Sequence, residues 1–318
     1  SVVQSITDEL SKARASLTAT LSGTTSQQLR HTLAADLNNA LEQLVVLCNT
    51  ERLNQYLFGG AEASVAPYAV ERDSQGNITR VTYQGSSEEQ KVEVVQGLEM
   101  SALLVGDSLF GADGTRDLTF YGETGAAAGT GTSSIRGDVL LNIRESAGSY
   151  ELSLDGEHWV AVTDANKTNV AVINPTTQEI LYVDASNITA EGKIPVRAEG
   201  TFDMFSVLIS ARDLLYNTEN LSDAQISKMM NDTVMLMQQV EEKVVRAFPI
   251  VGGRIQTLTS LRDSIEEMKL NTDDEISRLN DADITQVAID LARYLLLYEM
   301  SLNVASKMFN LSLLDFLS

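Results

Sequence analysis

The most regular helical pattern of this chain lies near its end, where residues 284–309 read ITQVAIDLARYLLLYEMSLNVASKMF. Apolar residues recur here at alternating steps of four and three, which places them along one side of a helix as in a coiled coil. This terminal stripe consists of Ile284, Ala288, Leu291, Leu295, Tyr298, Leu302, Ala305 and Phe309. Because a helix cannot bury such a side alone, the pattern predicts packing against another helix, of this chain or of another molecule.

Helical patterns also occupy the start of the chain and return at about Thr201. Two early stripes step by three and four, and they consist of Val3, Ile6, Leu10, Ala13 and Leu17, followed by Leu33, Leu37, Ala40, Leu44 and Leu47. They predict two helices, or a helical hairpin, before about Phe58. A later stripe runs from Met230 to Leu258 through Pro249. It predicts one bent helix there, with a broken pair of helices as the alternative.

The middle of the chain has a different pattern, in which short alternating apolar runs are separated by turn signals. Asp155-Gly156 lies between the runs 150–154 and 158–162, and this is the strongest hairpin signal in the sequence. Two more hairpins are predicted around Gly76-Asn77 and Asn174-Pro175. The region that follows Gly59 is therefore predicted to be mainly β.

These patterns together predict an α+β fold with a nested organisation. Residues 1–58 and 202–318 are expected to form one discontinuous, elongated helical domain, a bundle or coiled coil built from both chain ends. Residues 284–318 are its terminal coiled-coil helix, and residues 59–201 form a mainly β domain inserted between the two halves. The last helix has no obvious partner within the chain, so an assembly role gains support over an enzymatic one.

Composition excludes several classes of partner. The chain has 318 residues, and 23 Lys and Arg against 44 Asp and Glu leave a net charge of −21, which repels nucleic acid and anionic lipid. The longest apolar runs have five residues, 44–48 and 294–298, against about 18 needed to cross a bilayer. We predict no nucleic-acid partner and no membrane insertion. Ser1 lies inside an amphipathic pattern without a secretory signal, so we expect a trimmed N-terminus.

Residues suited to catalysis or metal binding are scarce. One cysteine, Cys48, cannot form an internal disulfide, and with only His31 and His158 no Cys/His zinc cluster can form. Neither histidine lies in a recognisable Ser-His-Asp context. Asp281 and Asp283 lie just before the terminal stripe, where acids favour a helix N-terminus. We therefore predict helix capping for these two acids, and no catalytic site, cofactor or metal.

Several short motifs resemble those of the flagellin family. Residues 49–60 read NTERLNQYLFGG and resemble the end of the N-terminal helical region of flagellins and hook-associated proteins, in which Asn precedes Tyr-Leu-Phe-Ala/Gly-Gly. The matching residues are Asn54, Tyr56, Leu57, Phe58, Gly59 and Gly60. Asp281-Ala282-Asp283 is similar to a C-terminal motif of the family, and Gly252 and Arg254 match its Val-Gly-Ala-Arg, in which Gly253 replaces the alanine. Residues 312–317 resemble the ending of the third hook-associated proteins rather than that of filament flagellin.

The resemblance implies a non-enzymatic structural role at the hook-filament junction of the bacterial flagellum. It implies an inner helical domain, an outward β domain, unfolded export through the flagellar type III channel, and a location outside the cell. The implied partners are other copies of the chain in a short ring, the preceding hook-associated protein, flagellin and an export chaperone. In the family, a segment before the position of Ser1 pairs with the C-terminal helix. Filament flagellin and an extracellular adhesin or binding module are the alternative interpretations.

Overall fold

The computed structural model describes residues 2–21, 26–95, 98–101, 103–114 and 117–316, without the side chains of 21, 94, 95, 98, 281–283 and 309–316. The chain forms two compact units, Ser1–Phe248 and Pro249–Ser318. Helices occupy both ends of the sequence and strands occupy its middle. The predicted α+β class is confirmed.

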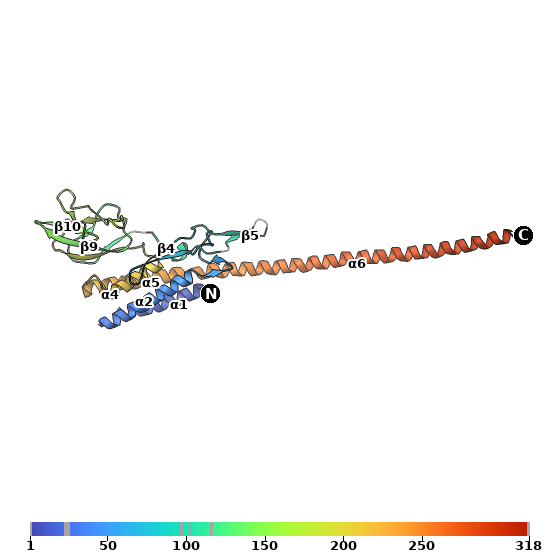
Figure 1. The fold of residues 1–318 in the computed structure, drawn as a ribbon, viewed down its shortest axis with the longest axis horizontal. Helices are drawn as coiled ribbons and strands as arrows, with labels where there is room; N and C mark the ends of the chain where they lie inside the picture. Colours follow the sequence, from blue (N-terminus) through green and yellow to red (C-terminus); the bar gives the residue numbers. More distant parts are fainter. Residues whose placement is uncertain (1, 22–25, 96–97, 102, 115–116, 317–318) are drawn as a thin grey trace. The chain divides into compact units, whose positions relative to one another are not determined.

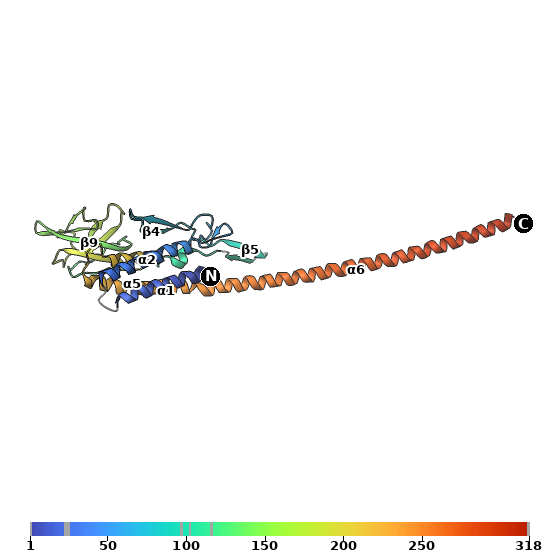
Figure 2. The same ribbon diagram turned by 60° about the horizontal axis from the view of Figure 1, so that its bottom comes forward.

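Four long helices belong to the first unit. They are α1 (Val2–Leu21), α2 (Gln27–Cys48), α4 (Met204–Tyr216) and α5 (Asp223–Val245). Helix α1 packs against α2 and α5, and α4 packs against α2 and α5, so the four lie side by side (Figures 1 and 2). The two helices predicted near the start are confirmed, although the second ends at Cys48. Helices from both sides of the β region thus share one core.

The helices of this unit begin at residues suited to capping. The side chain of Ser26 accepts the Leu29 N–H at the start of α2. Asp203 with Ser206, and Ser222 with Gln225, form reciprocal capping boxes at α4 and α5. Each cap satisfies backbone groups that have no partner inside the helix, and so defines where the helix starts.

The strands lie between α2 and α4, with the short helix α3 (Gly106–Phe110) among them. In chain order they are β1 (Glu51–Arg52), β2 (Gln55–Tyr56), β3 (Tyr68–Arg72), β4 (Ile78–Tyr83), β5 (Lys91–Val95), β6 (Leu98–Ser101), β7 (Leu118–Phe120), β8 (Ala127–Ala128), β9 (Gly137–Ser146), β10 (Ser149–Ser153), β11 (Val160–Ala161), β12 (Val170–Ile173), β13 (Ile180–Asp184) and β14 (Gly192–Ala198). Among the described residues they form a five-stranded sheet, β11-β10-β9-β14-β7, a three-stranded sheet, β12-β13-β8, and the pairs β1-β2, β3-β4 and β5-β6.

All three predicted hairpins are confirmed. Strand β10 pairs with β11 around Asp155-Gly156, β3 pairs with β4 around Gly76-Asn77, and β12 pairs with β13 around Asn174-Pro175. Each hairpin is antiparallel. In each, a turn signal between two apolar runs was sufficient to identify the pairing, because the chain reverses within a few residues.

The first unit contains two hydrophobic cores. One joins the helices to Phe58, Tyr68, Ile78, Val81 and Phe110, which come from the first part of the β region. The other lies between the five-stranded and three-stranded sheets, and its residues include Leu141, Ile143, Leu152, Val172, Leu181, Val183, Ile194 and Val196. The predicted domain limits at residues 58 and 201 remain a prediction.

Helix α6 (Ala247–Phe316) has 70 residues. The prediction of one bent helix across Pro249 is wrong, and the alternative of a broken pair is right, because α5 ends at Val245 and only Arg246 separates it from α6. Proline has no N–H, and its ring clashes with the carbonyl four residues earlier, here that of Val245. Pro249 is tolerated because it lies in the first turn of α6.

The capping role predicted for Asp281 and Asp283 is also wrong. Both residues lie in the interior of α6, where no helix begins, and their side chains lie outside the described part of the chain. No glycine or proline occurs from Arg254 to Phe316. Asp and Asn cost a helix only about 0.7 kcal/mol each relative to Ala, so they do not end it. No described helix is both long and apolar enough to span a bilayer.

Candidate assembly surface and the buried arginine joint

The terminal stripe is exposed along α6. Its large residues Ile284, Leu291, Leu295, Tyr298 and Leu302 are between 53% and 67% exposed. Ala288 is exposed and Ala305 is half-buried, while the side chain of Phe309 lies outside the described residues. Burial of a Leu or Ile side chain is worth about 1.5–3 kcal/mol, so this surface gives up considerable hydrophobic free energy while it faces water.

Exposed apolar residues are not confined to the predicted stripe. The same part of α6 also exposes Val287, Ile289, Tyr294, Leu296, Leu297, Met300, Val304 and Met308. A helix that is apolar on more than one side is normally buried among several neighbours. Large contiguous exposed apolar surface marks a site of interaction. The sequence had indicated one apolar side, and the structure adds that apolar residues surround much of this segment.

The first family motif lies where the chain leaves α2 and enters the β region. Phe58 is buried, with its ring edge-on to that of Phe110 at a centroid distance of 5.2 Å. The carbonyl oxygen of Phe58 accepts the N–H of Gly106 and the hydroxyl of Tyr83, both at 3.0 Å. Leu57 is half-buried, and its N–H donates to the carbonyl of Thr50 at 3.1 Å. This part of the motif therefore serves packing within the chain.

The two glycines of this motif have no room for a side chain. A Cβ at Gly59 would lie 2.7 Å from the carbonyl oxygen of Glu62. Gly60 has a φ of +62°, and its Cβ would lie 2.5 Å from the carbonyl oxygen of Ser86. Asn54 and the exposed part of Tyr56 belong to the neighbouring β1–β2 hairpin. Only glycine fits both positions, which explains why the motif ends in Gly-Gly.

The remaining motif residues lie on α6. Gly252 is exposed with open space around it, and Arg254 is half-buried. The backbone of Asp281, Ala282 and Asp283 is helical. A side chain would therefore fit at Gly252, whereas it would not fit at Gly59 or Gly60.

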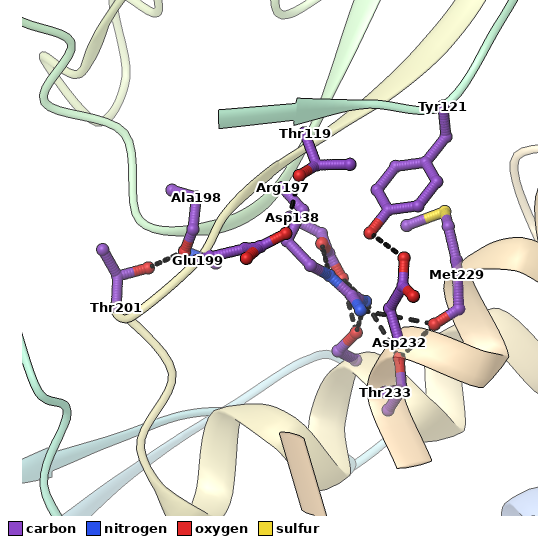
Figure 3. A network of polar contacts seen from close by, with 12 residues as sticks. Thr119, Tyr121, Asp138, Arg197, Ala198, Glu199, Thr201, Met229, Asp232 and Thr233 are labelled. Carbon is purple, nitrogen blue, oxygen red and sulfur yellow. Dashed lines mark hydrogen bonds and ion pairs between the residues drawn. The ribbon is translucent and has the colours of Figure 1, made fainter. Parts of the chain in front are cut away.

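A buried arginine joins the β region to the helices, and the sequence patterns did not indicate it (Figure 3). Along β14, Ile194, Val196 and Ala198 point into the core between the sheets. Arg197 points to the other side of the sheet and is fully buried. Its Nε lies 2.7 Å from Oδ1 of Asp138, and its Nη2 lies 2.9 Å from Oδ2 of the same carboxylate. This is a bidentate pair within the sheet, since Asp138 belongs to β9.

The same guanidinium reaches both helices beside the sheet. Nη2 donates to Ser210 Oγ on α4 at 3.1 Å and to Thr233 Oγ1 on α5 at 3.0 Å, and Nη1 donates to the carbonyl of Met229 at 3.3 Å. Burial lowers the pKa of Arg197, because it disfavours the charged guanidinium. The hydrogen bonds and negative charge of Asp138 have the larger effect, so the pKa of Arg197 is raised above its ordinary value. One charged side chain thus connects β9, β14, α4 and α5.

Tyr121 and Asp232 extend the contacts of Arg197, and we call this group of contacts around Arg197 the joint. The guanidinium carbon of Arg197 lies 5.7 Å from the ring centre of Tyr121, within cation–π distance. The Tyr121 hydroxyl donates to Oδ2 of Asp232 on α5 at 2.7 Å (Figure 3). Arg197 was missed because an arginine at an alternating position in a strand usually faces solvent. Only the placement of α4 and α5 shows that this side of β14 is covered.

The residues considered for chemistry lie apart from one another. Nδ1 of His158 is 2.6 Å from Oδ2 of Asp155 on an exposed turn, and the ring of His31 packs edge-on against that of Tyr216. Cys48 is buried, which raises the pKa of its thiol well above the ordinary value. In the part of the chain that the structure describes, no group of three or more His, Cys, Asp or Glu residues could hold a metal ion.

Several solved structures share this fold. FlgL of Xanthomonas campestris aligns over 87% of this chain and 91% of its own length, with a TM-score of 0.56 and 18% identity. Flagellar hook associated protein-3 from Legionella pneumophila aligns over 88% and 90%, with a TM-score of 0.56 and 13% identity. The flagellar junction protein FlgL from Legionella pneumophila aligns over 81% and 89%, with a TM-score of 0.50 and 15% identity.

These likenesses extend along most of both chains in each pair. No protein-family model and no curated protein sequence matches the chain. The resemblance predicted from the sequence motifs is thereby confirmed at the level of the fold: the chain folds like hook-associated proteins of the flagellum.

Proposed function

We propose that this chain is a structural subunit of the bacterial flagellum that joins hook to filament by subunit packing, without catalysis. The observation that carries the proposal is the exposed apolar surface of α6, at residues 284–308. The fold shared with FlgL and hook associated protein-3 structures supports it. An isolated molecule leaves this surface in water, whereas assembly would bury it.

The proposed partners follow from the extent of that surface. Copies of this chain in a ring, the preceding hook-associated protein and flagellin would each cover part of α6, because one neighbouring helix covers only one side. A chaperone would shield the same residues before export. In the assembled flagellum, residues 1–58 and 202–318 would form the inner helical domain and residues 59–201 the outward β domain. The site of action would be outside the cell, at the hook-filament junction.

The interface is tested with charges placed in the stripe. Leu295→Asp with Leu302→Asp in the full-length chain should abolish motility when it replaces the native junction protein, because two carboxylates would be buried without partners. Gln286→Asp is the control, since Gln286 lies nine residues before Leu295 and therefore on the opposite side of the helix. Normal filament growth with the double variant would show that the stripe is not an assembly surface.

Two further experiments distinguish a junction subunit from the alternative functions, filament flagellin and an adhesin. Purified full-length chain that polymerises into long filaments would indicate filament flagellin. A deletion that keeps motility but removes surface adherence would indicate an adhesin. A junction subunit is expected instead to form short assemblies and to be required for filament growth.

A further inference from the structure

Residues 118–198, which run from β7 to β14, have a hydrophobic core of their own, and we call them the sheet region. Among the described residues of this range, every buried hydrophobic side chain except that of Tyr121 belongs to the core between the two sheets. The earlier strands β3 and β4 differ, because Tyr68 and Ile78 pack into the helical core. The first unit therefore combines one body built on the helices with another built on the two sheets.

The chain enters and leaves the sheet region at one place. The N–H of Gly114 donates to the carbonyl of Gly200, and the N–H of Glu199 donates to the carbonyl of Asp117, both at 2.8 Å. Gly114 and Gly200 have left-handed backbones, with φ angles of +86° and +72°, and glycine changes such a conformation at little steric cost. Two chain crossings that lie side by side permit rotation about one axis, as in a hinge.

Arg197 makes uncharged contacts with the helices and a charged contact within the sheet region. On the helices it donates to the hydroxyls of Ser210 and Thr233 and to the carbonyl of Met229. Its ion-pair partner Asp138 lies on β9, and so belongs to the same body as Arg197 (Figure 3). Separating a buried charge from its partner is costly, but movement of the sheet region away from the helices leaves this pair together.

The other polar contacts printed between the two bodies involve Tyr121 and Lys193 of the sheet region. The Tyr121 hydroxyl donates to Asp232, and Gln225 Nε2 donates to the carbonyls of Tyr121 and Lys193 at 2.8 Å and 3.1 Å. Lys193 also pairs with Glu219, and because both side chains are about half exposed, this ion pair adds little stability. A polar interface of this kind is typical of domains that move relative to one another.

A cleft of about 1610 Å³ lies beside the joint. Its lining includes Leu140 and Thr177 of the sheet region, and Ile209 and Asp213 of α4. Surfaces that face a cleft are not packed against each other, whereas close-packed side chains would resist any rotation. The cleft therefore leaves the sheet region room to turn relative to α4.

We propose that the sheet region is a hinged domain that swings about Gly114 and Gly200, between the closed position of this structure and an open one. The joint holds the closed position. On opening, Arg197 keeps Asp138 and exchanges its contacts on α4 and α5 for water. The inference goes beyond the proposed function, because it concerns the single chain and does not depend on assembly.

Distances between spin labels in the purified full chain test the hinge. With Cys48→Ala as background, Ile173→Cys on β12 and Met235→Cys on α5 take the two labels of the interdomain pair, since both side chains are about half exposed. Leu29→Cys with Met235→Cys is the helix pair, whose labels both lie on helices that share one core. Pulsed EPR should give two distance components for the interdomain pair and one narrow component for the helix pair.

Removal of the acceptors on the helices should favour the open form. Ser210→Ala with Thr233→Val takes away both hydroxyls and leaves Arg197 paired with Asp138. The open component of the interdomain pair should increase several-fold in this double variant, because the closed form loses hydrogen bonds that the open form does not make. The helix pair should keep its narrow distribution.

A matched control removes two hydroxyls elsewhere. Ser227→Ala with Thr32→Val changes the same residue types at exposed positions of α5 and α2, and it should leave both label pairs unchanged. An equal increase of the open component in this control would overturn the role of the joint.

Three further outcomes would contradict the proposal. A single narrow distribution for the interdomain pair, in the parent chain and in the Ser210→Ala, Thr233→Val variant alike, would show that the sheet region is fixed. Two components that this variant leaves unchanged would show that the joint does not hold the closed form. Equal broadening of the helix pair in the variant would show a loosened helical core in place of a hinge.

Discussion

Helices α1 and α6 carry the same kind of apolar stripe and differ in what covers it. In α1, Val3, Ile6, Leu10, Ala13 and Leu17 are all buried, in contact with α2 and α5. In α6, the large stripe residues from Ile284 to Leu302 are more than half exposed. Both patterns alternate steps of three and four.

The difference shows that a stripe identifies the apolar side of a helix but not its partner. A buried stripe contributes to the folding of residues 1–248, whereas an exposed stripe of the same kind contributes only when a further helix covers it. The same substitution should therefore act on stability in residues 1–248 and on assembly in residues 249–318. Paired variants test this contrast.

The largest contrast is expected between two arginines. Arg197→Met leaves Asp138 without its partner inside the joint and should lower the free energy of unfolding by about 3–5 kcal/mol. Arg262→Met, at an exposed position of α6, should change it by less than about 0.5 kcal/mol. Guanidinium unfolding followed by the fluorescence of Trp159, the single tryptophan, measures both. Arg197→Met with Asp138→Leu should recover part of the loss, and equal stability of the two single variants would contradict the role of the joint.

The second contrast compares the stripes directly. Leu10→Ala removes a fully buried side chain and should cost about 2–5 kcal/mol. Leu295→Ala removes an exposed one and should change stability by less than about 0.5 kcal/mol, while it weakens assembly. Urea unfolding of the purified chain and motility of complemented cells are the two measurements. A large loss of stability from Leu295→Ala would mean that α6 is covered within the single molecule.

The third contrast compares two glycines of the family motifs. Gly60→Ala should destabilise by about 1–3 kcal/mol, because the residue is left-handed and its Cβ would overlap the carbonyl of Ser86. Gly252→Ala should instead stabilise by about 0.5–1 kcal/mol, because Gly252 lies in an exposed helix with open space around it. Thermal unfolding followed by circular dichroism checks both signs. Destabilisation by Gly252→Ala would show that this motif glycine is sterically required.

The smallest effect concerns a local turn rather than a stripe. The N–H groups of His158 and Glu157, and the His158 side chain, lower the pKa of Asp155 well below its ordinary value of 3.8. A depressed carboxyl pKa adds stability that is present above the ordinary value and is lost as the pH falls below it. Trp159 fluorescence should stay constant from pH 7 to about 4 and change at lower pH, while Asp155→Asn should abolish the change. An identical acid response in the variant would assign it to other carboxyls.

Local patterns predicted the helices that carry apolar stripes and three strand pairs. Hairpins were identified because a turn such as Asp155-Gly156 reverses the chain within a few residues, and the early helices were identified by their stripes. Helix ends were predicted less well. Pro249 has no N–H to donate to the carbonyl of Val245, and the chain forms two helices there, as the alternative prediction stated. Asp281 and Asp283 do not begin a helix, because no residue before them interrupts α6.

Two structural features were not predictable in the same way. Arg197 has the sequence context of a solvent-facing strand residue, and its burial depends on α4 and α5 lying over that side of β14. Leu53 belongs to a motif that was recognised, but its left-handed backbone and full exposure follow from the pairing of β1 with β2.

The sequence by itself determined the order of a helical, a β and a second helical region, the apolar side of the helices α1, α2, α5 and α6, and the family whose fold the chain shares. These depend on spacing between near neighbours, on turn residues and on short motifs, all of which are local. Only the tertiary structure decided that the stripe of α1 is buried while that of α6 is exposed, and that Arg197 is enclosed between a sheet and two helices. Burial depends on which distant segments meet, and a local pattern carries no information about them.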